Sequence, residues 1–574
     1  MVFNIVVNNR PIQAIQGETI LSALQRNGIQ VPTLCNMKDY SPTGACRMCV
    51  VEIEGRHNLT PSCSFPVEDW MKISTHSPRV LQARKTIVEL LLSNHPDDCL
   101  YCERNGNCEL QKLAEDLNIR ERRIPGKKSS HKLDKSSSGI IRDPAKCILC
   151  GRCVRVCEES QAVGCLDFSQ RGSKLIIATA MAKPLNFSNC ITCGQCVMVC
   201  PTGALTEKTQ FEEISNALHD PEKIIIAQYS PTIAVSLAEV FGLKGGKEIN
   251  GKINAALRKI GFHKVYESSF AADVNVIEMA EDFLKKQKEG DMLPMITGDC
   301  PAWIKYAEQF TPDFLRNITS VKSPQQIAGS LIKTWIAERE KINPANIYSV
   351  SIMPCIAKKS ESQRVEMTRK GISDIDTVLT TRELARLIRL HGVEIEQLEP
   401  EPPDEPMGGI SSSGKLFGVS GGVMESLLRT IYYKSTGKDL EEAKLPKLRN
   451  TRLVKETQLK IGKTELKVIA VSGISQAMHL LEQIRNKKKY YDIIEIMACP
   501  GGCVAGGGQP VRTEEGALRN RVKALYDSDS REPLKPAHRN PQVLALYEDF
   551  LTEPMSKKSI ELLHTSFTPR EVLI

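Results

Sequence analysis

Cysteines are the residues whose number and spacing carry the most chemical information in this chain. It has twenty of them in 574 residues, and nineteen stand at spacings typical of metal ligands, leaving only Cys165 over. Disulfides would need an oxidising compartment, and the first residues have neither the basic start nor the long apolar core of a secretory signal. We therefore expect metal sites in a cytoplasmic protein.

An internal repeat contains eight of these cysteines. Two copies of the pattern C-x2-C-x2-C-x3-C occur, as in bacterial ferredoxins with two clusters, where the fourth cysteine of each copy serves the other cluster. We predict one [4Fe-4S] cluster on Cys147, Cys150, Cys153 and Cys200, and a second on Cys157, Cys190, Cys193 and Cys196. Cys165, between the copies, is predicted to be a small buried hydrophobe.

Two further groups of candidate ligands precede the repeat. The first has a close pair with a more distant cysteine on each side, which suits a [2Fe-2S] cluster: Cys35, Cys46, Cys49 and Cys63. The second has one histidine followed by three cysteines, which suits a [4Fe-4S] cluster with one imidazole ligand: His95, Cys99, Cys102 and Cys108. Zinc is the alternative metal for both groups.

The last four cysteines, Cys300, Cys355, Cys499 and Cys503, follow apolar runs that are typical of buried strands. The glycines around Cys499 and Cys503 predict a backbone that comes close to something bulky. Four thiolates from three strand ends can hold one [4Fe-4S] cluster.

The segments around these cysteines resemble the signature motifs of [FeFe] hydrogenases, and the resemblance extends over essentially the whole chain. The segments are Thr297-Gly-Asp-Cys-Pro-Ala-Trp303, Ile352-Met-Pro-Cys-Ile-Ala-Lys-Lys359 and the stretch from Met497 to Pro510. The resemblance implies the reaction 2H⁺ + 2e⁻ ⇌ H₂ at a six-iron H-cluster. It implies that the four cysteines bind the cubane of that cluster and that Cys503 bridges to a two-iron subcluster with CO, cyanide and a bridging dithiolate.

The same resemblance implies which residues surround the two-iron subcluster: Pro231, Pro324, Gln325, Met353, Lys358, Phe417 and Met497. Lys358 is the clearest polar member, because a cation beside cyanide can form a charge-assisted hydrogen bond. Asp299 occupies the position where the family has a cysteine that relays protons.

A second departure concerns the outer proton relay. Met279 stands where the family has a glutamate, while Asp282 and Thr319 stand at another glutamate and a serine position. Methionine cannot relay a proton, whereas Asp299 can. Glu278 is one residue out of register, which on a helix rotates it by about 100°. Three outcomes stay open: a working enzyme with a changed proton route, an H₂ sensor or low-activity regulatory subunit, and an electron-transfer subunit without turnover.

The elements that must position these residues predict a multidomain α+β and α/β protein. Residues 1–80 are expected to form a β-grasp [2Fe-2S] domain, with a hairpin at Asn8-Asn9 and a helix over 19–27. We expect a small helical domain with the one-histidine site over 81–125 and a two-cluster ferredoxin domain over 126–209 that begins with a linker or surface loop over 126–139. A two-lobed H-cluster domain is expected over 210–574. That last domain is predicted to have parallel strands at 224–227, 292–296, 347–352, 468–471 and 493–497, and helices over 272–286 and 381–390.

The composition and the absence of certain sequence motifs limit the classes of partner that this chain is expected to bind. A formal charge of +8 without Lys/Arg clusters argues against nucleic acid, and no apolar run is long enough for an integral membrane segment. No glycine fingerprint for a dinucleotide follows a strand, so coupling to NAD(P) would need a partner subunit. The resemblance implies H₂ and protons as reactants, maturation proteins, and either ferredoxin or NAD(P)-linked flavin and iron–sulfur subunits as partners. The N-terminal third also resembles the electron-input modules of complex I and some formate dehydrogenases, and the C-terminal part resembles iron–sulfur assembly proteins.

Overall fold

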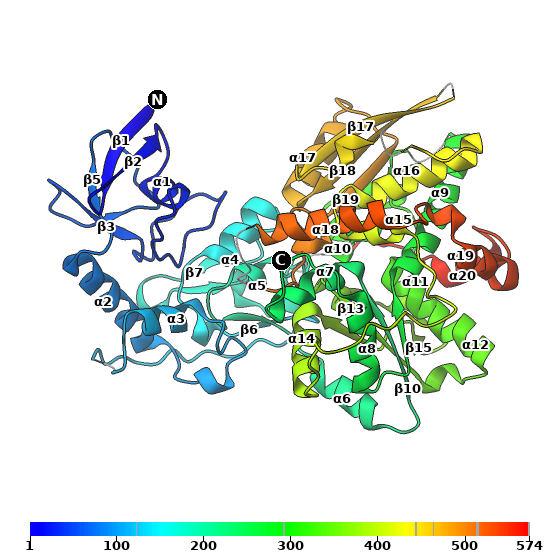
Figure 1. Ribbon diagram of the computed structural model, residues 1–574, viewed down its shortest axis with the longest axis horizontal. Coiled ribbons are helices and arrows are strands. Elements are labelled where there is room, and N and C mark those ends of the chain that lie inside the picture. Colours follow the sequence, from blue (N-terminus) through cyan, green and yellow to red (C-terminus); the bar gives the residue numbers. More distant parts are fainter. Residues whose placement is uncertain (122, 291–292, 442–444, 463, 512–515, 572–574) are drawn as a thin grey trace.

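The computed structural model spans residues 1–574 and describes all of them except 122, 291–292, 442–444, 463, 512–515 and 572–574. Figure 1 shows the N-terminal β-rich domain at one end of the molecule and the larger α/β part at the other, with the cluster-motif segments between them. Within the described residues, no helix is both long enough and apolar enough to cross a membrane.

The N-terminal domain is a five-stranded sheet of order β2-β1-β5-β3-β4 with one packed helix. Strands β1 (Val2–Val7) and β2 (Arg10–Ile15) form the predicted hairpin, with Asn8 and Asn9 at φ 49° and 65°, as a two-residue turn of this kind requires. Helix α1 (Ile20–Arg26) begins after Thr19, whose side chain caps it, and it buries one apolar face on the sheet. The other strands are β3 (Val50–Ile53), β4 (Thr60–Pro61) and β5 (Lys72–Ser74).

Two helices form the next region, as the sequence predicted. Helix α2 (Pro78–Asn94) begins after the capping residue Ser77, and α3 (Glu109–Asp116) follows the cysteine triad. Arg84 of α2 is fully buried and donates to the carbonyl oxygens of Met48 and Val50 at 3.0 and 2.8 Å. Because a buried guanidinium needs such acceptors, this contact ties α2 to the cysteine loop of the first domain.

The repeat folds into two matching halves. Strand β6 (Ile140–Arg142) pairs with β9 (Leu205–Glu207), and β7 (Asp167–Ser169) pairs with β8 (Ile176–Ala178). The short helices α4 (Arg152–Arg155) and α5 (Gln195–Val199) each begin after a glycine with positive φ, at 72° for Gly151 and 75° for Gly194. Two residues before each glycine, Leu149 and Thr192 also have positive φ, at 55° and 58°. The sequence repeat is therefore a backbone repeat.

Residues 126–139, predicted to be a linker or surface loop, contain no helix or strand, and the second half of this loop packs against the repeat. Asp134 accepts a hydrogen bond from the Leu185 amide at 2.9 Å, and its backbone pairs with that of Arg142. Ser137 is buried, and its hydroxyl accepts from the amides of Gly139 and Ile140. Short polar side chains here satisfy backbone groups of a packed segment, a role that composition does not distinguish from that of a surface loop.

The C-terminal part contains two four-stranded sheets. In the first, β11 (Lys264–Glu267), β10 (Ile224–Tyr229), β13 (Ile347–Met353) and β16 (Thr377–Thr380) are all parallel. In the second, β12 (Met295–Ile296), β19 (Ile493–Met497) and β18 (Thr464–Ser472) are parallel, but β17 (Val454–Ile461) is antiparallel to β18. The prediction of two parallel lobes is thus right for the first sheet and incomplete for the second. The strand predicted over 292–296 is shorter in the structure: β12 covers Met295–Ile296, residues 293–294 are not in a strand, and residue 292 lies outside the described residues.

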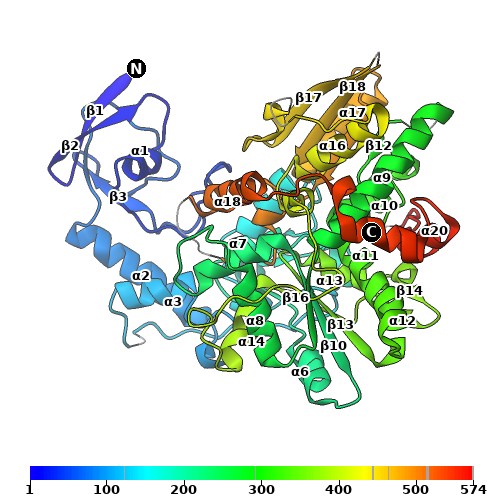
Figure 2. The same ribbon diagram turned by 45° about the vertical axis from the view of Figure 1, so that its right-hand side comes forward.

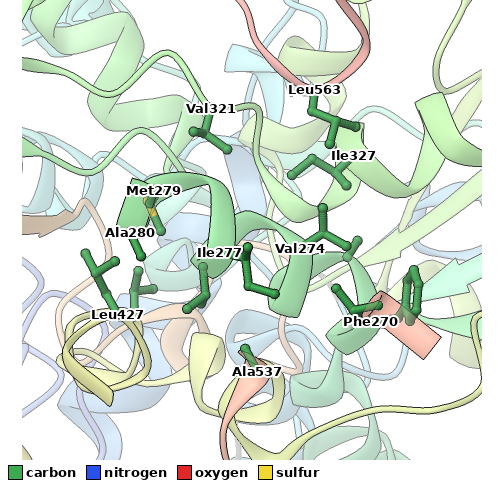
Figure 3. Packing of buried hydrophobic residues seen from close by; sticks show 14 of the residues in the cluster. Phe270, Val274, Ile277, Met279, Ala280, Val321, Ile327, Leu427, Ala537 and Leu563 are labelled. Carbon is green, nitrogen blue, oxygen red and sulfur yellow. The ribbon is translucent and has the colours of Figure 1, made fainter. Parts of the chain in front are cut away.

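A long helix, α9 (Ser269–Glu289), lies at the centre of this part. It packs against α16 (Gly422–Thr436), α11 (Pro324–Leu331) and α20 (Lys557–Leu563), and Figure 3 shows side chains from these elements meeting along it. Met279 is fully buried in this apolar contact. The predicted helix over 272–286 is therefore real but longer, and α14 (Thr381–Leu390) matches the other predicted helix.

The glycines after β19 allow close backbone packing between distant segments. An ideal Cβ on Gly506 would lie 2.2 Å from the Pro354 carbonyl oxygen, and one on Gly507 would lie 2.5 Å from the Cys193 carbonyl oxygen. No side chain fits at such distances. The bulky neighbours that the glycines predicted are thus, at these positions, other loops of the chain, and the close approach joins the repeat to the C-terminal cysteine loop.

Candidate active site and electron-relay sites

The four C-terminal cysteines stand at the carboxyl ends of parallel strands, where open α/β sheets place their sites. Cys300 follows β12 and caps α10 (Pro301–Phe310), Cys355 follows β13, and Cys499 and Cys503 follow β19. The charges of Cys300 and Cys355 affect both Cys499 and Cys503, so the four thiols lie together. Burial raises the pKa of Cys355 to about 11. Thiols so shielded would ionise only beside a cationic group such as a metal cluster.

Two hydrogen bonds to sulfur surround this group. The Ala498 amide donates to Cys300 Sγ at 3.4 Å. Gln195 Nε2 donates to Cys499 Sγ at 3.2 Å and to the Ala505 carbonyl oxygen at 3.1 Å. Gln195 belongs to the ferredoxin repeat, so this contact also joins two domains. The sequence analysis missed it, because 304 residues separate the two partners.

Lys358 joins several of the predicted pocket residues. Its Nζ donates to the backbone carbonyl of Asp299 at 3.2 Å and pairs with Glu361 Oε2 at 2.8 Å. Gln325, next to Pro324 at the start of α11, donates to the Lys358 carbonyl oxygen at 3.2 Å and to Glu361 Oε2 at 3.1 Å. Glu361 was missed by the sequence analysis, although its i,i+3 spacing from Lys358 was a usable signal.

The remaining predicted pocket residues lie at element ends around this group. Met353 ends β13, Met497 ends β19, and Pro231 begins α7 (Pro231–Val240). Phe417 is half-buried. Its neighbour Gly418 packs on Thr232, so closely that an ideal Cβ on Gly418 would lie 2.3 Å from Thr232 Cγ2. The segments of Pro231 and Phe417 are therefore adjacent.

Asp299 is half-buried as a residue, but its carboxylate oxygen Oδ2 is buried. Its Oδ1 accepts from Asn275 Nδ2 at 2.9 Å, and its Oδ2 is buried with no hydrogen-bond partner among the described residues. Burial raises its pKa to about 7. An orphaned carboxylate oxygen in such a place fits a group that donates or shares a proton.

The outer relay positions lie further along α9. Thr319 Oγ1 and Lys286 Nζ both donate to Asp282 Oδ2 at 2.9 Å. Helical spacing puts Asn275, Met279 and Asp282 on one face of α9, so buried Met279 separates the Asp299–Asn275 contact from Asp282. Glu278 points elsewhere: it accepts from Tyr547 Oη at 2.7 Å and from the Met555 amide at 2.9 Å.

The repeat cysteines gather in two enclosed sites. Cys147, Cys150, Cys153 and Cys200 line one cavity, and Cys157, Cys190, Cys193 and Cys196 line another, the crossed grouping that the repeat predicts. The amides of Leu149 and Thr192 donate to Cys147 Sγ and Cys190 Sγ, both at 3.4 Å. Cys165 is buried beside the second site, with its Sγ 3.3 Å from Ser188 Oγ.

The one-histidine site has a matching orphaned atom. The ring Nδ1 of His95 lies 3.0 Å from the Pro96 carbonyl oxygen, while its Nε2 is buried with no partner among the described residues. A metal-binding imidazole has this arrangement, with one nitrogen oriented by the backbone and the other free for the metal. Cys99 of the same group is exposed, and Cys102 Sγ packs against Gly203.

The four cysteines of the first domain also lie together. Cys35 interacts directly with Cys46 and Cys63, and Cys49 interacts with Cys63. An apolar cluster around Leu34, Met48 and Leu110 brings in Cys46, Cys108 and Ile148, one from each of the three N-terminal cluster motifs. Among the described residues, no three His, Cys, Asp or Glu side chains converge on one point as ligands of a single ion.

This combination defines an iron–sulfur protein whose ferredoxin-like sites lead to a buried cysteine site at strand ends. Comparisons with family models agree. Residues 223–507 match the iron only hydrogenase large subunit, C-terminal domain, and 515–570 match the iron hydrogenase small subunit. Residues 2–78 match a 2Fe-2S iron-sulfur cluster binding domain, 84–123 match the NADH-ubiquinone oxidoreductase-G iron-sulfur binding region, and 146–204 match a 4Fe-4S dicluster domain.

Individual relatives span nearly the whole chain. The NADP-reducing hydrogenase subunit HndD of Solidesulfovibrio fructosivorans is 41% identical over 99% of both chains. Iron hydrogenase 1 of Clostridium pasteurianum is 34% identical over 98% of this chain and 99% of its own. A solved structure of the apo [FeFe]-hydrogenase HydA1 from Chlamydomonas reinhardtii, in a single-substitution variant, is 32% identical, with a TM-score of 0.57 over 62% of this chain and 98% of that chain. The chain belongs to the [FeFe] hydrogenase family, and it is an iron–sulfur oxidoreductase.

Proposed function

We propose that Cys300, Cys355, Cys499 and Cys503 hold the cubane of an H-cluster, with Cys503 as the bridge to its two-iron part. The observation that carries this is the meeting of four thiols from three strand ends, those of Cys355 and Cys499 buried, with Lys358 and Asp299. When bound, this cluster supplies the redox chemistry of 2H⁺ + 2e⁻ ⇌ H₂. Lys358 Nζ provides a buried cation at its edge, and Gln325 holds the Lys358 backbone in place.

We further propose that electrons pass through one [2Fe-2S] and three [4Fe-4S] clusters. Their ligands would be the four groups assigned from the sequence: the crossed sets of the repeat, Cys35, Cys46, Cys49 and Cys63, and His95 with Cys99, Cys102 and Cys108. The contacts support this order, because three N-terminal motifs meet in one apolar cluster and Gly507 packs against Cys193. The domain limits 1–80, 81–125, 126–209 and 210–574 go with this assignment.

Asp299 takes the place of the relay cysteine in this proposal. Its orphaned Oδ2 is the group that would hold the proton, and Asn275 orients the carboxylate through Oδ1. The donor Asn275 bonds Oδ1, so among the described residues nothing else bonds the buried Oδ2, and this oxygen is free to hold a proton.

The electron partner is proposed from the relatives. HndD is named a subunit of an NADP-reducing hydrogenase, and residues 84–123 match a region of an NADH-linked oxidoreductase. A flavin and iron–sulfur partner that handles NAD(P) therefore fits better than ferredoxin alone. Exposed Cys99, with Leu100 85% and Tyr101 90% exposed beside it, offers one surface where such a partner could approach a cluster.

The test is H₂-dependent viologen reduction by protein matured with its dedicated assembly proteins, normalised to the CO and cyanide bands in the infrared. Bands with turnover support the proposal, and their absence from matured protein contradicts it. An Asp299→Cys variant measured beside it reports on the proton relay. Similar rates would mean that Asp299 serves as well as the thiol.

One observation favours a second candidate, an H₂-sensing or regulatory subunit with low activity. Met279 is fully buried between the inner and outer relay positions, so the family's path along α9 is interrupted. Full infrared bands with slow turnover, restored by Asp299→Cys, would favour this role.

A further inference from the structure

A surface cavity of about 310 Å³ lies directly behind the segment of Asp299. Gly298 and Pro301, on either side of Asp299 and Cys300, line it, together with Ser323 and Glu361. Val365, which is 85% exposed, lies at its mouth. The cavity therefore brings solvent close to the proposed active site from a side that α9 does not border.

Glu361 is the side chain that joins this cavity to the site. Its side chain is only 6% exposed, yet it lines the cavity. Its Oε2 accepts from Lys358 Nζ at 2.8 Å, from Ser323 Oγ at 3.0 Å and from Gln325 Nε2 at 3.1 Å. Lys358 Nζ in turn reaches the Asp299 carbonyl oxygen at 3.2 Å. An unbroken set of hydrogen-bonding groups thus runs from the cavity to the ammonium group at the site.

The α9 side offers no equivalent among the described residues. From Asp299 the first contact is Asn275, a primary amide, and the next residue on that face is Met279, which has no group that exchanges protons. The hydrogen-bonded pair of Asp282 and Thr319 lies beyond Met279, which separates it from Asn275 and Asp299.

We infer that Glu361 is the outer proton relay of this chain, carrying protons between the cavity behind Asp299 and Lys358, while Asp299 keeps the inner position proposed above. This rests on the proposed hydrogenase function and deepens it. In the direction of H₂ formation, the ammonium group of Lys358 gives a proton to the site. A hydronium ion in the cavity then protonates the Glu361 carboxylate, and Glu361 passes that proton from Oε2 to the neutral Nζ. The reverse order serves H₂ oxidation. Only protons move, and the complete sequence returns Lys358 and Glu361 to their charged starting states.

The charges around Glu361 come from several elements. Lys358 faces it from α13 (Ala357–Ser362), and Arg364, just after that helix, also interacts with it. The carboxyl of Asp299 interacts with it from the strand-end loop. Ser323 and Gln325 contribute neutral donors from the start of α11. Arg364 Nη2 donates to Glu308 Oε1 at 2.7 Å, so the charge of Arg364 is balanced mainly by Glu308 and only partly by Glu361.

The test uses matured full-length protein and compares Glu361→Ala with Glu366→Ala. Glu366 lines the same cavity but pairs with Arg364 and Arg570 instead of Lys358, which makes it the matched control. Turnover per infrared-detected two-iron unit should fall at least ~10-fold in Glu361→Ala and stay within about twofold in Glu366→Ala. Formate, small enough for the cavity, should restore the Glu361→Ala rate with a pH profile that follows formic acid.

A readout apart from turnover is the cyanide stretching frequency, which should shift in Glu361→Gln because Lys358 loses its anionic partner. Asp282→Asn should stay within about twofold of the unsubstituted protein. A Glu361→Ala rate within twofold of the unsubstituted protein would overturn the inference, and so would a loss that formate does not restore. Failure of the hydrogenase proposal itself looks different: the unsubstituted matured protein would then lack CO and cyanide bands or turnover.

Discussion

The proposed cluster ligands, called here the electron side, and the proposed proton-transfer residues, called the proton side, differ in how closely they follow the family pattern. On the electron side, the two predicted cysteine groups of the repeat each line an enclosed site, and the two repeat halves even share their positive-φ positions. On the proton side, Asp299 and Met279 both depart from the family pattern, and the structure surrounds Met279 with apolar side chains (Figure 3).

The difference follows from how each side is built. A cluster site needs all its ligands at once, since one missing thiolate disables it, and most of these ligands lie a few residues apart. A proton route is a series of contacts between side chains from separate elements, and another series can replace it. Figure 2 shows α9 and α13 as separate helices of the C-terminal part, and the two possible routes use one each. If the proposed assignments hold, the electron path can stay the same while the proton path changes.

The largest effect should come from replacing Cys503, the proposed bridging ligand of the H-cluster. Cys503→Ser should abolish the CO and cyanide bands and reduce H₂ turnover to background, because a serine hydroxyl does not replace a bridging thiolate. The paramagnetic signals of the N-terminal clusters should remain, since their ligands are elsewhere. Cys165→Ser is the control, and it should retain both. Loss of the N-terminal signals in Cys503→Ser would show that the two sides are not independent.

Asp299→Asn should have the next largest effect. It keeps the size of the side chain and one acceptor for Asn275, but it removes the acid, so turnover per two-iron unit should fall by about 10² or more. The infrared bands should keep their intensity. Rates measured from about pH 5 to 9 should also lose the dependence that Asp299 contributes, whose pKa burial raises to about 7. Turnover unchanged by this substitution would remove Asp299 from the proton side.

Met279→Glu should change turnover less than Asp299→Asn does, and it tests whether Met279 interrupts the proton route along α9. It would place an acid between Asn275 and Asp282 and so reopen the α9 face. In that background, Asp282→Asn should lower turnover severalfold, whereas in the unsubstituted chain it should not. A buried glutamate is costly, so the midpoint of thermal unfolding should fall as well. Equal sensitivity to Asp282→Asn in both backgrounds would mean that Met279 is not the interruption.

The features that the sequence could predict depend on residues close together in the chain, and the features that it could not predict depend on contacts between distant residues. Spacing alone predicted the crossed grouping of the repeat, and the Asn8-Asn9 hairpin followed from local chemistry. The contacts of Gln195 with Cys499 and of Asn275 with Asp299 join residues 304 and 24 positions apart, and no local pattern announces them. The antiparallel edge strand β17 alternates buried and exposed residues, and this alternation is a signal of an edge strand. The direction in which Glu278 points also follows from the helical rotation of one residue.

Replacing Glu278 should change turnover least of all these substitutions. Its expected effect is on the stability of the fold. It lies on α9, and its side-chain hydrogen bonds to other described residues all go to the C-terminal segment, to Tyr547, Met555, Ser559 and His564. Burial acts to raise its pKa, but the hydrogen bonds from His564, Ser559, Tyr547 and the Met555 amide outweigh it and hold the pKa below the usual value. A lowered pKa means that the carboxylate stabilises the fold above about pH 4.5 and that this stabilisation is lost as pH falls through the folded pKa.

Glu278→Gln should therefore leave turnover within about twofold and destabilise the protein by about 1–3 kcal/mol at pH 7, since an amide cannot accept all these bonds. Unfolding followed by denaturant at pH 7 and pH 4 should show a smaller difference between the two pH values in the variant. Glu281→Gln, three residues on and bonded to Lys434 at a more exposed site, is the control and should change stability little. A large loss of turnover in Glu278→Gln at full cluster content would instead connect α9 to the proton side through the C-terminal segment.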